Sequence, residues 1–206
     1  MAYLFVILLG YLLGCSNMAY YIGKAKHKDL RSAGSNNLGA SNAAVLLGWG
    51  AGIAVALHDI GKAALAVLLA KLLFPQAEFA GAAAGVAAVL GHIFPFYLGF
   101  KGGKGLASFY GMALALDWKL GVLAGLVILL ATLITDYIVI GTFSTIVVVP
   151  TYLGIVFQSL LLAGIVCVAS LVIFYKHWEN IGRIIRKEEI GLRSTIRGDN
   201  RMDKKT

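Results

Sequence analysis

The sequence is poor in charge and in cysteine. Only 14% of its 206 residues are charged, against about 25% in a soluble domain, while 59% are hydrophobic and the mean hydropathy is +0.82. This composition excludes an ordinary soluble domain and indicates a membrane protein. The two cysteines, Cys15 and Cys167, lie far apart in apolar segments, which excludes a disulfide scaffold or a thiolate metal site. We expect no metal and no cofactor.

The few charges are unevenly placed, and their excess is basic. The formal net charge is +8, and nine of the 18 Lys and Arg residues lie at or after Lys176. A second basic group is Lys24, Lys26, Lys28 and Arg31. Such a face is typical of a membrane protein that meets anionic lipid. Aromatic residues are not interleaved with these charges, so we expect membrane lipids and no nucleic acid as partners.

Long apolar stretches make up most of the chain. Residues 1–13 have neither a basic start nor a small-residue cleavage site, so the first segment is expected to be a permanent span. A crossing takes about 20 residues. Stretches suited to crossing are 3–23, 52–73 and 79–99, then a short one at 106–116 and three crossings within 120–175, broken near Asp136 and Gln158. The sequence predicts an all-α integral membrane protein with about seven transmembrane helices.

The basic clusters orient these spans. Clusters at 24–31, 101–104 and 176–205 all fall on the cytoplasmic side if the N-terminus is outside and the C-terminus is cytoplasmic. We therefore expect a single transmembrane domain over residues 1–190. Residues 191–206 are polar and basic, and we expect them to form a disordered tail.

One stretch, GHIFPFYLGFKGGKG, combines glycine and lysine in a way suited to phosphate. Gly102 and Gly103 leave no Cβ between a ligand and the backbone, and Lys104 adds a point charge. The apolar run after Lys104 predicts a helix, and a helix N-terminus favours an anion. The stretch is not a Walker A loop, because Leu98 stands six positions before the lysine and Gly105 follows it. The alternative is a cytoplasmic turn whose basic residues only orient the flanking helices.

Two further polar segments share this predicted face. Residues 34–42 are Gly, Ser and Asn apart from Leu38 and Ala40, which suits either a binding loop or a flexible one. Near the C-terminus, His177, Asn180 and Arg183 are spaced i, i+3, i+6 and would share one helix face. Imidazole, amide and guanidinium on one face would suit a phosphorylated polyol. The alternative is a basic amphipathic helix lying on anionic lipid.

Three ionisable residues fall inside predicted spans. Asp59 and Lys62 are i, i+3 on the second span, and His92 lies near the cytoplasmic end of the third. Ionisable groups within a span are expensive and usually face a cavity or a partner. They suit either a functional site or a structural pair between helices, and for His92 the structural interpretation is favoured.

Together these segments resemble one enzyme family. The motifs DLRSAGSNNLGASN, DIGK, GHIFPFYLGFKGGKGLA and HWENIGRIIRKEE are similar to those of the bacterial acyl-phosphate:glycerol-3-phosphate acyltransferases, from about residue 9 to Glu189. The resemblance implies seven spans in the bacterial cell membrane, with the motif loops towards the cytoplasm. It also implies transfer of an acyl chain from acyl phosphate to the 1-hydroxyl of glycerol 3-phosphate, giving lysophosphatidic acid and phosphate in phospholipid synthesis.

The resemblance also implies roles for particular residues. The acyl-phosphate set is Gly102, Gly103, Lys104 and Gly105. The glycerol-phosphate set is Ser35, Asn37, Asn42, His177, Asn180 and Arg183. The expected catalytic residues are Lys104, His177, Asn180 and Ser35. The expected supporting residues are Asp59, Lys62, His92, Glu179 and Glu189.

The acceptor side departs from the family pattern. Asn36 replaces a glycine, Ser41 a threonine and Val45 an arginine suited to phosphate. An acyl phosphate is an activated anhydride, so the reaction needs positioning and electrostatics rather than a covalent nucleophile. Either His177 or a phosphate oxygen of a substrate could take the acceptor's proton. The alternatives are a transporter or channel built around Asp59 and Lys62, and a catalytically altered homologue with a different acceptor.

Overall fold

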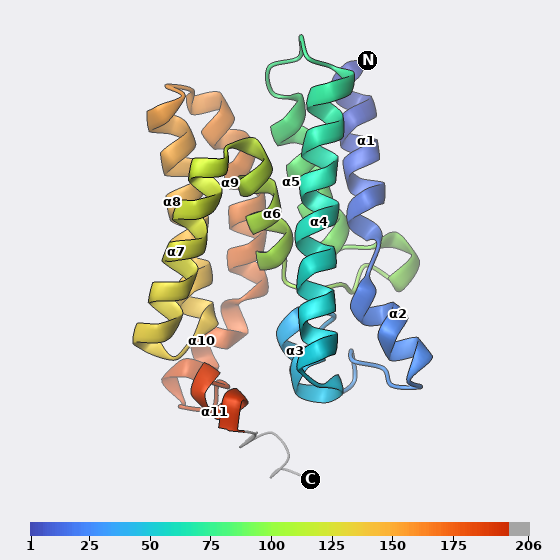
Figure 1. The fold of residues 1–206 in the computed structure, drawn as a ribbon, viewed down its shortest axis with the longest axis vertical. Helices are drawn as coiled ribbons and strands as arrows, with labels where there is room; N and C mark the ends of the chain where they lie inside the picture. The colour runs from blue at the N-terminus through green and yellow to red at the C-terminus, as the bar shows by residue number, and fades with distance from the viewer. Residues whose placement is uncertain (198–206) are drawn as a thin grey trace.

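The computed structural model describes residues 1–197, all of them in helices or connecting turns (Figure 1). The longer helices are α1 (Ala2–Cys15), α4 (Trp49–Leu73), α5 (Ala80–Ile93), α6 (Leu106–Leu116), α7 (Trp118–Thr135), α8 (Ile138–Val156) and α9 (Leu160–Lys176). The shorter ones are α2 (Met18–Ala25), α3 (Ala40–Leu47), the 3₁₀ turn η1 (Phe96–Leu98), α10 (Trp178–Ile185) and α11 (Leu192–Arg197).

The long helices run side by side in two groups. In Figure 1, α7, α8 and α9 stand on one side and α1, α4 and α5 on the other, with α6 between them. Buried residues of α5, α6, α8 and α9 form one hydrophobic cluster that joins the groups. The short helices α2, α3, α10 and α11 gather at one end, and the N-terminus lies at the opposite end. The basic residues of 24–31 and those of the described part of the C-terminal cluster, 176–197, therefore lie at the same end.

Within residues 1–197, five helical segments are long and apolar enough to cross a membrane, with α1–α2 and α5–η1 each counted as one. The number rises to six if α9 and α10, which meet at 43°, form one bent span. The protein is thus an all-helical, multi-pass integral membrane protein. The short apolar helix predicted at 106–116 is α6, and the predicted breaks near Asp136 and Gln158 separate α7, α8 and α9.

Small residues bring α1 and α5 into close contact. A Cβ at Gly10 would overlap the carbonyl of Ala84, and one at Gly14 would overlap that of Ala88. Small residues let helix backbones approach this closely in a membrane. The tight contact fixes the end of α5 relative to α1, and the site described below is built on that end.

The first span was expected as one stretch, 3–23, but its helix breaks between α1 and α2. Asn17 caps α2 by accepting a hydrogen bond from the Tyr20 N–H at 2.9 Å. The backbone carbonyl of Ser16 accepts from Lys62 Nζ at 2.6 Å. The break is stable inside the bundle because side chains satisfy the backbone groups that it frees.

Within the expected tail, residues 192–197 form α11. The first N–H groups of this helix are satisfied by the turn between α7 and α8: Leu192 donates to the Asp136 carbonyl and Arg193 to the Asp136 carboxylate, both at 2.8 Å. A carboxylate at a helix N-terminus is stabilising. The rest of the predicted tail, 198–206, lies outside the described residues.

Candidate functional site

The Gly102–Gly105 turn lies against the end of α5. The N–H of Gly102 donates to the Ile93 carbonyl at 3.1 Å, and that of Gly103 to the His92 carbonyl at 3.2 Å. Gly103 is buried directly over the His92 ring, where a Cβ would overlap Nε2. These two N–H groups are therefore occupied by α5. Binding of phosphate by Gly102 and Gly103 stays a prediction. In this structure their N–H groups hold the turn against α5.

The groups open to an anion come next in the chain. Gly105 has φ +99°, a left-handed conformation that glycine adopts without strain, and it is the N-cap of α6. A Cβ here would also press on Ile93 and Ile173. Because the first N–H groups of a helix have no partner within it, α6 presents donors just beyond Lys104.

Lys104 is joined to the C-terminal motif by a chain of polar contacts. Its Nζ donates a short hydrogen bond to Oδ1 of the buried Asn180. The Asn180 amide donates to Glu189 Oε1 at 2.6 Å, and Arg183 Nε donates to Glu189 Oε2 at 2.6 Å. Glu189 therefore fixes the orientation of Asn180, so that the amide oxygen faces Lys104. Burial and the nearby Arg183 charge lower the pKa of Lys104 to about 8.

His177 stands at the bend between α9 and α10. It is 6% exposed, and its Nδ1 lies 2.8 Å from the Ile173 carbonyl. A carbonyl can only accept, so Nδ1 must carry the proton, and Nε2 of the neutral ring is left as an acceptor. An acceptor nitrogen at this point could receive a hydrogen bond from a substrate hydroxyl.

Asn42 organises the polar loop before α3. It is 2% exposed, and its amide donates to the carbonyls of Leu30 at 2.9 Å and Asn37 at 2.9 Å. Its oxygen accepts from the Ser35 N–H at 2.9 Å, and the Asn37 amide donates to Ser35 Oγ at 2.7 Å. The loop is thus ordered rather than flexible. Contact of Asn42 with a substrate stays a prediction, and its hydrogen bonds already explain why an asparagine stands there.

The ionisable residues of the spans form one buried network under the turn. Asp59 Oδ1 lies 2.8 Å from Lys62 Nζ and 3.3 Å from His92 Nδ1. His58 lies 3.5 Å from the same oxygen and 3.0 Å from Ser16 Oγ. Asp59, Lys62 and His92, the three expected supporting residues of the spans, therefore lie together. His92 in turn lies against Gly103.

Leu38, to which no site role was assigned from the sequence, connects the first loop to the glycine turn. Its N–H lies 3.4 Å from the Gly102 carbonyl, and its own carbonyl faces Gly103. The sequence signal was that it is the one large apolar residue among residues 34–42. The structure thus joins the three predicted segments, because Leu38 contacts Gly102 and Asn180 contacts Lys104. Glu179 is the outlier, since its side chain is 88% exposed and lies 3.9 Å from Arg183.

The chain is similar to known proteins over nearly its whole length. A sequence model of the family described as "Glycerol-3-phosphate acyltransferase" matches residues 4–187. The chain is 37% identical over 206 residues to Glycerol-3-phosphate acyltransferase 1 of Oceanobacillus iheyensis, covering 94% of this chain and 97% of that protein. It is 35% identical over 185 residues to the Glycerol-3-phosphate acyltransferase of Lactiplantibacillus plantarum, covering 89% of each.

Two solved structures are also similar. Both are crystal structures of PlsY (YgiH), described as an integral membrane glycerol 3-phosphate acyltransferase, and both are 30% identical to this chain. The glycerol 3-phosphate form matches with a TM-score of 0.88 over 94% of this chain and 97% of that one. The lysophosphatidic acid form matches with a TM-score of 0.84 over 93% and 95%.

The close contact between Gly103 and the His92 ring of α5 can be tested through protein stability. Gly103→Ala places a methyl group against the His92 ring, and we expect it to lower the free energy of unfolding by about 1–3 kcal/mol, the usual cost of overpacking. Thermal unfolding in detergent measures the effect. Gly61→Ala, where no atom lies within 4 Å of the added Cβ, is the control. His92→Ala should make Gly103→Ala nearly free of cost, and simple additivity of the two changes would contradict the contact.

Proposed function

The chain belongs to the glycerol-3-phosphate acyltransferase family, and we propose that it takes its acyl group from an acyl phosphate. The acceptor is the 1-hydroxyl of glycerol 3-phosphate, and the products are lysophosphatidic acid and inorganic phosphate. The observation that carries this proposal is the convergence of three polar segments on Lys104, at the start of a helix. A cation beside free helix N–H groups is suited to the leaving phosphate of an activated donor.

Lys104 and the start of α6 bind the acyl donor. In the reaction, a new bond forms between the acceptor oxygen and the acyl carbon, and the bond from that carbon to the phosphate oxygen breaks. Charge then collects on the departing phosphate, where Lys104 and the first N–H groups of α6 stabilise it. The proton of the acceptor hydroxyl passes to the phosphate, so no strong protein base is needed.

The C-terminal motif binds and orients the acceptor, glycerol 3-phosphate. Nε2 of His177 accepts the hydrogen bond of the reacting hydroxyl and so directs its oxygen at the acyl carbon. Arg183, held by Glu189, supplies positive charge for the acceptor's own phosphate, and Asn180 keeps Lys104 aligned between the two substrates. Ser35 and Asn37 close the site from the loop before α3.

An apolar groove is the place we assign to the acyl chain. It has a volume of about 570 Å³ and lies between α1, α5 and α9. Its walls are Tyr3, Ile7, Phe79, Ala83, Val86, Ala87, Leu90, Leu161, Ile165 and Val168. The small α5 side chains of Ala83 and Ala87 leave this space. The groove extends along α5 towards the end on which the glycine turn sits.

A product assay tests the donor and the role of Lys104 together. Purified protein with acyl phosphate and labelled glycerol 3-phosphate should give lysophosphatidic acid on thin-layer analysis, and acyl thioesters should not replace the acyl phosphate. Lys104→Met should lower kcat/KM by about 100-fold or more, as loss of a charged transition-state contact does. Because the pKa of Lys104 is lowered to about 8, kcat/KM should fall as the pH rises above 8. Persistence of that alkaline limb in Lys104→Met would assign it to another group.

We further propose that the chain crosses a bacterial cell membrane seven times, with α6 as the short fourth span. This count adds α6 and the bent α9–α10 pair to the five longer spans. The N-terminus is then outside, and the site faces the cytoplasm together with the basic clusters. In a variant without native cysteines, a cysteine at Arg186 should react with a membrane-impermeant reagent only in inverted vesicles, and one at Gln76 only in intact cells. Labelling of Arg186→Cys in intact cells would invert the topology.

Val45 stands where the family pattern has an arginine, and it lies on α3 one turn after Asn42. This difference can be tested by restoring the arginine. If an arginine here would bind the acceptor phosphate, Val45→Arg should lower the apparent KM for glycerol 3-phosphate, by up to about 100-fold for a full charged contact of about 1.5–3 kcal/mol. If this chain uses another acceptor, the same change should reduce activity with that acceptor. Val45→Met is the size-matched control without charge. An unchanged KM for glycerol 3-phosphate and for neutral polyols would show that position 45 does not contact the acceptor.

A further inference from the structure

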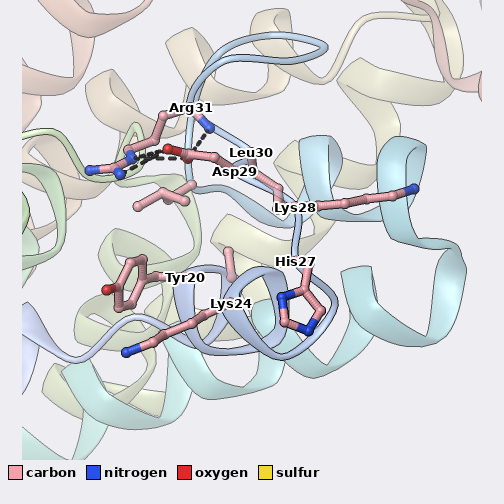
Figure 2. A pocket seen from close by; sticks show the side chains of 9 residues that line it. Tyr20, Lys24, His27, Lys28, Asp29, Leu30 and Arg31 are labelled. Carbon is pink, nitrogen blue, oxygen red and sulfur yellow. Dashed lines mark hydrogen bonds and ion pairs between the residues drawn. The ribbon is translucent and has the colours of Figure 1, made fainter.

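A second pocket, separate from the site around Lys104, opens between α2 and the chain that follows it (Figure 2). Its volume is about 330 Å³. Its lining residues are Ala19, Tyr20, Lys24, His27, Lys28, Asp29, Leu30, Arg31 and Leu38. The inner residues Ala19, Leu30 and Leu38 are buried and apolar, whereas the outer ones are polar and mostly basic. A hydrophobic floor under a basic rim is suited to an anionic amphiphile.

The pocket is made by a tight reversal at the end of α2. His27 has φ +53°, an uncommon conformation for a residue with a side chain, and the Lys28 N–H donates to the Gly23 carbonyl at 2.8 Å. The returning chain then lies so close to α2 that a Cβ at Gly23 would overlap the Lys28 carbonyl and the Leu30 side chain. The reversal holds Leu30 over α2 and leaves the rim residues around the opening.

The rim cations point to two different sides. In Figure 2 the Arg31 guanidinium, the Tyr20 hydroxyl and the Lys24 ammonium lie on one side of the pocket, and the Lys28 ammonium extends to the other. Asp29 fixes Arg31 through Nε at 3.0 Å and Nη2 at 2.9 Å. That pairing leaves Nη1 of Arg31 for a ligand. Two cations and one hydroxyl on one side of an apolar floor are suited to a phosphate.

The walls of this pocket belong to the loops that build the reaction site. The Leu30 carbonyl accepts from Asn42, the residue that orders Ser35 and Asn37. The Leu38 N–H faces the Gly102 carbonyl. A ligand that held the chain from Lys24 to Leu38 in place would therefore steady both neighbours of Lys104.

We propose that this pocket binds the phosphate headgroup of an anionic phospholipid from the cytoplasmic leaflet, and that the bound lipid stabilises the active arrangement of the adjacent loops. Lys24, Arg31 and Tyr20 would hold the phosphate, and the proximal acyl chains would lie over Leu30 and Leu38. The proposal uses the topology of the proposed function but not its reaction. A lipid source is favoured over a free phosphate because the floor of the pocket is apolar and α2 continues a membrane span.

Lipid binding is measured directly by native mass spectrometry of the full chain released from phosphatidylcholine nanodiscs that contain phosphatidylglycerol. The wild type should retain one phosphatidylglycerol. Lys24→Gln should weaken that binding about fivefold, the equivalent of about 1 kcal/mol for one cation at an anionic surface. The matched control is Lys26→Gln, which removes the same charge two residues away, outside the pocket lining. It should retain the lipid.

Activity and competition complete the test. Adding phosphatidylglycerol to phosphatidylcholine nanodiscs should raise kcat of the wild type and of Lys26→Gln by about fivefold, and should raise that of Lys24→Gln much less. Arg31→Lys, which keeps the charge but loses the paired geometry, should behave like Lys24→Gln. Equal losses of lipid binding in Lys24→Gln and Lys26→Gln would show general attraction to the leaflet and overturn the site. Displacement of the lipid by millimolar glycerol 3-phosphate would make the ligand a soluble phosphate and overturn the lipid assignment.

Discussion

The structure around the site depends on one buried ion pair, Asp59 with Lys62 on α4. Charges inside an apolar bundle are tolerated only when they are paired and hydrogen-bonded. Here the carboxylate also meets His92, and the ammonium also meets the Ser16 carbonyl, so that one pair joins α4 to the break in the first span and to the end of α5. Gly103 then lies on the His92 ring. The glycine turn is positioned by this network rather than by its own flexibility.

The same contacts decide between the functions that the sequence left open. A transporter built on Asp59 and Lys62 would need these groups to face a pathway, but both are more than 90% buried and directed at each other and at His92. They support a site instead of forming one. The polar groups assigned to the substrates are instead those around Lys104 and His177. That arrangement is expected of an enzyme whose substrates arrive from one face.

Periodicity and charge predicted the elements well, because long apolar stretches and basic clusters leave few alternatives in a membrane. The start and end of α6 and the breaks around α8 were read directly from the sequence. The break at Ser16 was not predicted, since it depends on Lys62, which is 46 residues away. The helix at 192–197 was missed for the same reason, because its cap is Asp136. Contacts across such distances leave no local pattern in one sequence.

Within the site, residue types were predictable from the motifs, but several of their tasks were not. A glycine suggests an open N–H group, and only the structure shows that the N–H groups of Gly102 and Gly103 are already bound by α5. An asparagine suggests a ligand contact, yet Asn42 uses its amide to order its own loop. Motif spacing identifies which residues a family requires. It does not separate those that touch the substrate from those that hold them.

The short length of α6 connects this geometry to the chemistry. Eleven residues of helix measure about 16 Å, roughly half of the 30 Å core of a bilayer. In Figure 1, α6 accordingly lies between the two groups of longer helices, and Lys104 stands two residues before its first residue, Leu106. On the proposed topology, the donor phosphate is therefore bound below the surface of the membrane. A donor whose acyl chain stays among α1, α5 and α9 can reach that depth without leaving the bilayer, whereas the soluble acceptor enters from the cytoplasm and meets it at Lys104.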